Sequence, residues 1–153
     1  MEISLKKASV EDAELIHSMQ IIAFRPLLDK YQDHDYSPAN ETLERTIYRI
    51  SLPVADHWLI LLGDSPIGAI GIGRYEECCK LKRLFILPEY QNRGYAQQAV
   101  HMVEAQYPAG THWELDTILQ EEKLCHLYEK LGYRKTDRIK PIKEGMDLVF
   151  YEK

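Results

Sequence analysis

The chain has 153 residues, of which 45% are hydrophobic and 28% are charged, and its formal net charge is −5. This length predicts a single domain, residues 1–153, that is large enough to bury a core. The acidic balance disfavours a nucleic-acid-binding protein, because such domains are more often basic with clustered Lys and Arg. An acidic surface weakly favours a cationic partner such as an amine.

The cysteines and the absence of long apolar runs indicate the compartment. Cys78, Cys79 and Cys125 are odd in number and two are adjacent, which indicates a reducing environment rather than a disulfide framework. They lack CxxC spacing, so we expect no metal site. Residues 1–7 contain no signal-peptide core, and no apolar run approaches the roughly 20 residues that a membrane span needs. We therefore expect a cytoplasmic protein that does not associate with membranes.

The first half of the chain alternates between helical and strand periodicity. In chain order we expect a strand over Ile3–Lys7, a helix capped by Ser9 with Asp12 that runs to about Phe24 and breaks at Pro26, a loop over Gln32–Pro38, a helix capped by Asn40 that runs to about Ile50, and a hairpin of strands Trp58–Leu62 and Ile67–Tyr75. Three glycines lie inside the second hairpin strand, where close packing or a bulge explains them better than a nucleotide-binding loop: Gly68, Gly71 and Gly73.

The second half adds crossover helices. We expect a strand over Leu81–Leu87, a helix from near Gly94 to about Tyr107, a strand over Thr111–Thr117, a helix over Glu121–Leu131, a strand from Tyr133, a polar excursion over Arg138–Gly145 and a final strand over Met146–Tyr151. Hairpins come first and crossovers later, which predicts an α/β (α+β) fold with a mixed, mostly antiparallel sheet. The unit from Leu81 to Thr117 should be a right-handed parallel crossover.

The turn before the helix at Gly94 has the properties of an anion site. A helix N-terminus presents free N–H groups and a positive dipole end, Gly94 allows close approach of the backbone, and Arg93 adds a charge. A pyrophosphate is the natural occupant. The chain has neither a P-loop nor the GxGxxG of a dinucleotide fold at this turn.

Residues 91–96, Gln-Asn-Arg-Gly-Tyr-Ala, match the pattern Q/R-x-x-G-x-G/A. This stretch resembles the acyl-CoA pyrophosphate loop of the GNAT superfamily of N-acetyltransferases. A second block, residues 127–133 with the sequence Leu-Tyr-Glu-Lys-Leu-Gly-Tyr, is similar to the L-Y-x-K-x-G-F/Y of that superfamily. The spacing of the two blocks and the order of elements over essentially the whole chain strengthen the resemblance.

The resemblance implies a fold, an activity and a set of roles. The sheet would carry helices on both faces, and two strands would splay around an acyl-CoA cleft. Acetyl-CoA would donate an acetyl group to a primary amine of a small molecule or peptide. Tyr128 would protonate the leaving thiolate, as a phenol is able to do near neutrality. The cofactor would bind the strand and the loop through Leu84, Phe85, Ile86, Asn92, Arg93, Gly94, Tyr95, Ala96 and Gln97.

Several features stay open at this level. Each site residue also has a plain reading: Tyr128 as a core aromatic, Arg93 as a surface charge and Gly94 as a helix start. Two positions depart from the family: Glu121 replaces a frequent cofactor-binding Asn, and Lys80 replaces the Glu base of some members. The general base is a water chain or one of five carboxylates: Asp33, Asp35, Glu41, Glu114 or Asp116.

The acceptor and the assembly are equally open. The aromatic and acidic stretch Tyr31–Tyr36 is a candidate binding segment for a cation, and Arg138–Gly145 is a second place to seek the acceptor site. Dimers are common in the superfamily, which leaves a homodimer open. A non-catalytic acyl-CoA sensor and a small nucleotide-binding module are the alternatives to an enzyme.

Overall fold

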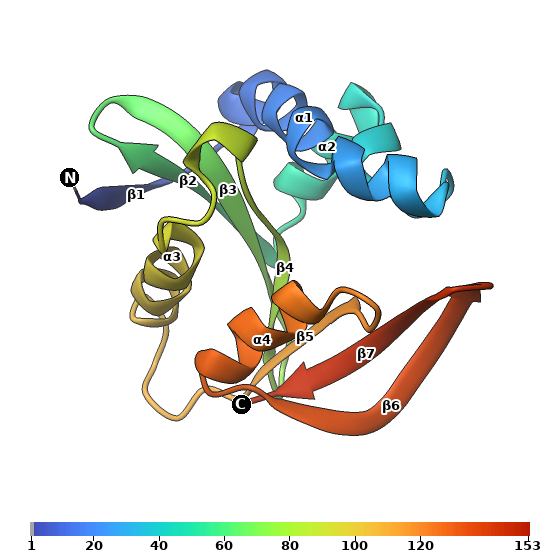
Figure 1. Ribbon diagram of the computed structural model, residues 1–153. Helices are drawn as coiled ribbons and strands as arrows, with labels where there is room; N and C mark the ends of the chain where they lie inside the picture. Colours follow the sequence, from blue (N-terminus) through green and yellow to red (C-terminus); the bar gives the residue numbers. More distant parts are fainter. Residues whose placement is uncertain (1) are drawn as a thin grey trace.

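The computed structural model describes residues 2–153 and has one seven-stranded sheet with four α-helices (Figure 1). In chain order the elements are β1 (Ile3–Lys7), α1 (Ala13–Tyr31), α2 (Leu43–Ser51), β2 (Ala55–Leu62), β3 (Ser65–Arg74), β4 (Cys79–Ile86), α3 (Tyr95–Glu104), β5 (Trp113–Ile118), α4 (Glu122–Lys130), β6 (Arg134–Lys143) and β7 (Met146–Glu152). The strand order is β1-β2-β3-β4-β5-β7-β6, and every neighbouring pair is antiparallel except β4 and β5. The predicted fold class and the parallel crossover from β4 to β5 are confirmed.

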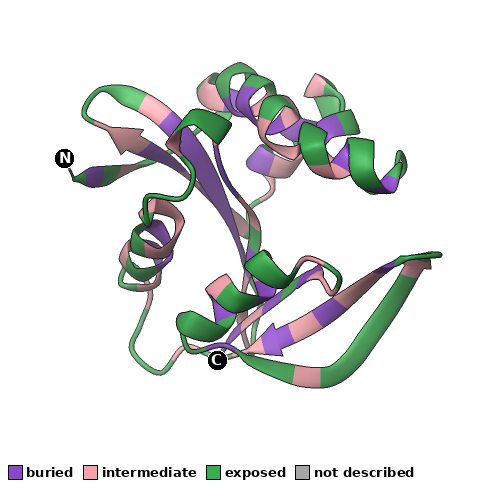
Figure 2. Ribbon diagram, in the orientation of Figure 1, coloured by how far each residue is buried: buried purple, intermediate pink, exposed green. Residues whose placement is uncertain are grey.

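Helices cover both faces of the sheet, as the alternation of side chains along β4 shows. Phe85 packs in a cluster with residues of α1, whereas the next residue, Ile86, packs in a cluster with Ala99 of α3. The central strand β3 is buried over most of its length, because it is covered on both faces (Figure 2). Within the described residues, no helix combines the length and the apolar character needed to cross a bilayer.

The predicted break at Pro26 is wrong, because α1 continues through that residue to Tyr31. A proline inside a helix removes one backbone N–H and leaves the carbonyl four residues earlier without its partner. That carbonyl belongs to Ile22, a residue that is 54% exposed and so lies on the solvent side of the helix. The turn beyond Pro26 buries Leu28 and Tyr31, and this apolar burial offsets the cost of the proline.

Two other boundaries differ from the sequence prediction. Thr42, not Asn40, caps α2, because its hydroxyl accepts a hydrogen bond from the backbone N–H of Arg45 at 3.2 Å. The predicted polar excursion over Arg138–Gly145 mostly belongs to β6, which pairs with β7 as far as Lys143. β6 is an exposed edge strand with polar residues on both faces, so its sequence lacks the alternation that marks a strand.

Candidate active site

The sheet opens between its two parallel strands. β4 and β5 pair only at Cys79 with Trp113 and at Lys80 with Glu114. The register of β4 with β3 shifts between Lys82 and Phe85, and Arg83 within this bulge adopts a left-handed conformation with φ 54°. A bulge of this kind bends a strand and increases its twist. The edge of β4 that faces β5 is therefore unpaired from residue 81 onward.

The backbone of Leu84 and Ile86 points toward this opening. The N–H of Leu87 donates to the carbonyl of Ile67 on β3 at 2.8 Å. Successive residues of a strand direct their backbone groups to opposite sides, so Leu84 and Ile86 direct theirs away from β3. The carbonyl of Ile86 accepts a hydrogen bond from the Gln91 side chain at 2.8 Å. Its N–H group remains directed at the opening.

Gln91 thus has a role that the sequence did not reveal. It is the first residue of the Q/R-x-x-G-x-G/A pattern, and its side-chain amide ties the turn to the end of β4. The turn and the strand edge are consequently held at a fixed distance. A ligand that spans both would meet a preformed surface.

The turn after β4 ends in a helix start with free donors. Gly94, the N-cap of α3, has φ 82°, a left-handed conformation that glycine adopts without strain. The first hydrogen bond within the helix runs from the N–H of Gln98 to the carbonyl of Gly94. The N–H groups of Tyr95, Ala96 and Gln97 come before it, so they lack partners within the helix and face any anion at this end.

Positive side chains lie at the same turn. Arg93 is exposed there, as the sequence suggests. Lys123 on α4 approaches from another element, and its ammonium group donates to Oδ1 of Asn92 at 2.8 Å. Asn92 itself is left-handed, with φ 64°. Lys123 was not identified from the sequence, because nothing in its local pattern indicates that α4 meets this turn.

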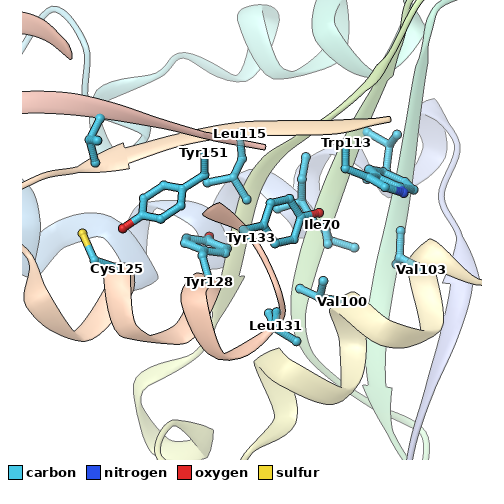
Figure 3. Packing of buried hydrophobic residues seen from close by; sticks show 13 residues of the cluster. Ile70, Val100, Val103, Trp113, Leu115, Cys125, Tyr128, Leu131, Tyr133 and Tyr151 are labelled. Carbon is cyan, nitrogen blue, oxygen red and sulfur yellow. The ribbon is translucent and has the colours of Figure 1, made fainter. Parts of the chain in front are cut away.

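Tyr128 lies on α4 between two other tyrosines (Figure 3). Its ring centroid is 6.1 Å from that of Tyr133 and 6.4 Å from that of Tyr151, and the residue is only 7% exposed. Burial raises the pKa of Tyr128 above its ordinary value, and the negative charge of Asp116 adds to this effect. Tyr128 is therefore a protonated phenol at neutral pH.

The three tyrosines of this cluster differ in their hydrogen bonds. Tyr133 donates to Glu104 at 2.6 Å and Tyr151 donates to Glu129 at 2.7 Å. The Tyr128 hydroxyl makes no such bond to a residue that the structure describes. Of the three tyrosines, Tyr128 is the one whose hydroxyl proton is not donated to a carboxylate.

The five candidate bases lie in different environments. Asp116 is exposed on β5 at the opening. Partial burial raises its pKa, although Lys80 and Lys82 act in the opposite direction. Glu114, on the same strand, lies 3.2 Å from His112. A small cavity of about 30 Å³ is lined by both carboxylates and by Lys80, Leu81, Lys82, Leu115 and Phe150.

Glu41 is the centre of a buried ion cluster, which disfavours its use as a base. Its side chain is 6% exposed and pairs with Arg49 at 2.8 Å and with Arg83 at 2.9 Å. Burial alone would raise the pKa of Glu41, but hydrogen bonds from Arg49 and Thr46 and the charge of Arg83 lower it to about 2. A carboxylate that binds protons so weakly is a poor proton acceptor.

The segment between α1 and α2 borders a pocket of about 330 Å³, which we call the α2 pocket. Its lining residues are His34, Asp35, Tyr36, Ser37, Asn40, Glu41, Arg45 and Arg83. Asp33 is buried outside this lining, and its Oδ1 atom has no hydrogen-bond partner among the described residues. Of the predicted cation-binding stretch, Asp35 and Tyr36 are the acidic and aromatic residues that reach the pocket.

Tyr31 and Glu121 form a contact within the protein that the sequence did not predict. The hydroxyl of Tyr31 and the ammonium group of Lys30 both donate to Oε2 of Glu121, at 2.5 and 2.6 Å. These bonds join the end of α1 to the residue that precedes α4. Tyr31 is thereby engaged within the protein, and Glu121 connects the two halves of the molecule across the opening.

Comparison with known proteins identifies the relatives of this arrangement. Residues 20–133 match the family model described as the acetyltransferase (GNAT) family. An acetyltransferase from Thermus thermophilus aligns with a TM-score of 0.77 at 20% identity, covering 100% of this chain and 97% of that one. A sequence comparison with curated proteins gives no match.

Two further structural neighbours have described acceptors or ligands. The ribosomal-protein-S18-alanine N-acetyltransferase from Escherichia coli aligns with a TM-score of 0.77 at 13% identity, covering 99% of this chain and 92% of that one. Spermidine N-acetyltransferase from Vibrio cholerae, in complex with CoA and spermine, aligns with a TM-score of 0.76 at 15% identity, covering 99% and 94%. At these identities the neighbours establish the fold alone.

Proposed function

Since the chain belongs to the GNAT family of acetyltransferases, whose members use acetyl-CoA, we propose that it moves an acetyl group to the primary amine of a small molecule or peptide. The proposal treats residues 1–153 as one catalytic domain. The observation that supports it is the unpaired edge of β4, which is followed along the chain by the free N–H groups that begin α3. An extended pantetheine arm fits the first feature and a pyrophosphate the second.

Acetyl-CoA binding is proposed as follows. The arm lies along Leu84, Phe85 and Ile86 and takes hydrogen bonds from the backbone that faces β5. The pyrophosphate accepts hydrogen bonds from the backbone of residues 92–97, with Arg93 and Lys123 supplying positive charge. Gln91 supports this geometry because it fixes the turn to the carbonyl of Ile86.

The transfer itself requires three events. The neutral amine attacks the thioester carbonyl, a C–N bond forms, and the resulting oxyanion accepts a hydrogen bond from a backbone N–H of β4. The C–S bond then breaks, and Tyr128 donates its proton to the departing thiolate. The proton that the amine loses passes to a base, and a proton from solvent restores the phenol.

Asp116 is the carboxylate that we propose as the base, acting directly or through water. It lies on β5 beside the opening, and it is near enough to Tyr128 for its charge to raise the pKa of that tyrosine. Its own raised pKa favours proton acceptance relative to Glu41.

Replacing Asp116 by Asn should lower kcat/KM at neutral pH by roughly 100-fold, within the usual range for a general base. Glu114→Gln on the same strand is the matched control, and equal activity of the two variants would reject Asp116.

The role of Tyr128 is tested by replacement with Phe. Loss of a general acid should lower kcat roughly 100-fold or more and leave the acetyl-CoA dissociation constant unchanged. The stability should also change little, because the hydroxyl makes no hydrogen bond to a described residue. Tyr133→Phe is the control, since it loses a hydrogen bond to Glu104 and should affect stability more than turnover. Unchanged turnover in Tyr128→Phe would assign this residue to the core alone.

Titration calorimetry separates the enzyme from its alternatives. We expect acetyl-CoA to bind and ATP not to bind, and an amine panel to release free CoA thiol. Binding without thiol release for any amine would favour a sensor. Binding of ATP instead of acetyl-CoA would contradict the whole proposal.

A further inference from the structure

The lining of the α2 pocket carries two arginines and two carboxylates, and a third arginine lies next to it. Arg45 and Arg83 line it, and Arg49 lies directly behind, bonded to the same carboxylate as Arg83. Two of these guanidinium groups, those of Arg49 and Arg83, bind Glu41 directly. The only other carboxylate in the lining is that of Asp35.

Glu41 is saturated by hydrogen bonds from the protein. Its two oxygens accept from Arg49, from Arg83 at 2.9 Å and from Thr46 at 2.7 Å, and Gln20 adds a longer bond at 3.2 Å. No lone pair of this carboxylate is left for a cationic substrate. Glu41 therefore neutralises part of the arginine charge, but it does not make the pocket a cation site.

Arg83 has donors left over. A guanidinium has five N–H donors, and that of Arg83 makes one hydrogen bond, from Nη1 to Glu41. Burial lowers the pKa of Arg83, and the neighbouring charges of Arg49 and Arg45 lower it further. The charge of Glu41 and its hydrogen bond to Arg83 act in the opposite direction, so Glu41 compensates part of this repulsion.

Arg45 is the second available guanidinium. It is exposed on the first turns of α2, and its guanidinium carbon lies over the ring of Tyr48, 5.1 Å from the ring centroid. A cation–π contact of this kind uses the face of the guanidinium rather than its N–H donors. Such a fork suits the two oxygens of a carboxylate.

We propose that the acceptor carries a carboxylate, held by Arg45 and Arg83, in addition to the amine that is acetylated. This inference rests on the proposed function and names the substrate class of the same site. Arg83 directly precedes Leu84, whose backbone borders the opening, so the anion would bind next to the strand that we propose for the pantetheine arm. A volume of 330 Å³ suits a free amino acid or a similar amino carboxylate. A polyamine would instead place cations against guanidinium groups.

The direct test compares acceptors that differ only in the carboxylate. The pairs are L-phenylalanine with phenethylamine and L-lysine with 1,5-diaminopentane, and 2-aminoethylphosphonate serves as a phosphonate arm. Thiol release should give a kcat/KM at least 10-fold higher for the amino acid of one or both pairs. Faster release with the phosphonate than with either amino acid would replace the carboxylate by a phosphoryl group and reject our assignment.

Variants connect the preference to the arginines. Arg45→Gln should raise the KM for the amino acid roughly 10-fold, with little change in kcat or in acetyl-CoA affinity, because a charge-assisted hydrogen bond is lost. It should leave phenethylamine unaffected. Arg83→Gln should act in the same direction, but it also breaks the pair with Glu41, so Arg45→Gln is the cleaner variant. Arg25→Gln, at an exposed position of α1 outside the pocket, is the control.

The outcomes separate the two proposals. If decarboxylated amines react as well as the amino acids, or better, the chain remains an acetyltransferase and the carboxylate inference is wrong. The inference is equally wrong if acetyl-CoA binds and no amino carboxylate releases thiol. A failure to bind acetyl-CoA would instead overturn the proposed function, and the inference with it.

Discussion

Replacement of Glu41 by Gln removes the one negative charge from a cluster that also contains Arg49 and Arg83. The magnitude follows from the pKa of about 2, against an ordinary value of 4.5. One pKa unit corresponds to 1.36 kcal/mol, so ionised Glu41 contributes about 3 kcal/mol to the free energy of unfolding at neutral pH. Removing one partner of a buried pair costs about 3–5 kcal/mol in other proteins, which agrees.

The sign of the pH dependence follows from the lowered pKa. A carboxyl group whose folded-state pKa is depressed stabilises the protein above its unfolded-state pKa, and this contribution is lost as the pH falls through the folded-state value. For Glu41 the window runs from about pH 4.5 down to about pH 2. The linkage relation leaves a contribution of about 1.4 kcal/mol at pH 3.

Urea denaturation at pH 7 and pH 3 measures both quantities. The stability difference between the wild-type protein and Glu41→Gln should be about 3 kcal/mol at pH 7 and should fall by about half at pH 3. Glu44→Gln, at an exposed position on the first turn of α2, is the control and should change stability by less than about 0.5 kcal/mol. A difference below about 1 kcal/mol at pH 7, or one that does not vary with pH, would refute the assignment of Glu41 as the paired centre of the cluster.

Two glycine pairs give further predictions. A Cβ at Gly68 would lie 2.1 Å from the carbonyl oxygen of Phe85, whereas one at Gly71 would lie 3.1 Å from the nearest atom. Gly68→Ala should therefore lower the unfolding free energy by about 1–3 kcal/mol, and Gly71→Ala should lower it by less. Equal losses of stability in thermal denaturation would contradict this prediction. Gly94 and Gly110 are both left-handed, with φ 82° and 86°, and neither has crowded surroundings. Valine at either position should cost about 1–2 kcal/mol of stability, but only Gly94→Val should weaken acetyl-CoA binding in calorimetry.

The elements that the sequence predicts well are those whose pattern is local. Ser9 and Asp12 form the expected capping box, because both partners lie within one turn of chain. On β5, the alternate residues Trp113, Leu115 and Thr117 share one face of the predicted strand, and all three are buried. Alternating burial of this kind follows from the alternation of apolar and polar residues along a few neighbouring positions.

The elements that the sequence predicts poorly depend on distant partners. The strand beyond Arg138 exists because β7 supplies its hydrogen bonds, and its own residues are polar and exposed. Pro26 stays helical because burial further along α1 offsets its cost. In the site, the turn at Gly94 is predicted by its sequence motif, but the ion cluster is not predicted. Glu41 binds Arg83, which lies 42 residues away in the chain, and the residues around Glu41 do not indicate this contact.

The same ion cluster connects the opening of the sheet to the α2 pocket. Arg83 is a non-glycine residue in a left-handed conformation, which costs about 1–2 kcal/mol. A charge-assisted hydrogen bond to a buried carboxylate is worth about 1.5–3 kcal/mol, so the bond to Glu41 is large enough to offset that cost. The bulge that separates β4 from β5 is therefore stabilised from outside the strand, by the segment that lines the α2 pocket. Arg83 shapes the proposed acyl-CoA cleft. Its remaining N–H groups are also those that we propose to bind the acceptor substrate. It follows that the two substrates of the proposed reaction would meet at Arg83, with the acetyl donor along the backbone that follows it and the acceptor anion at its side chain.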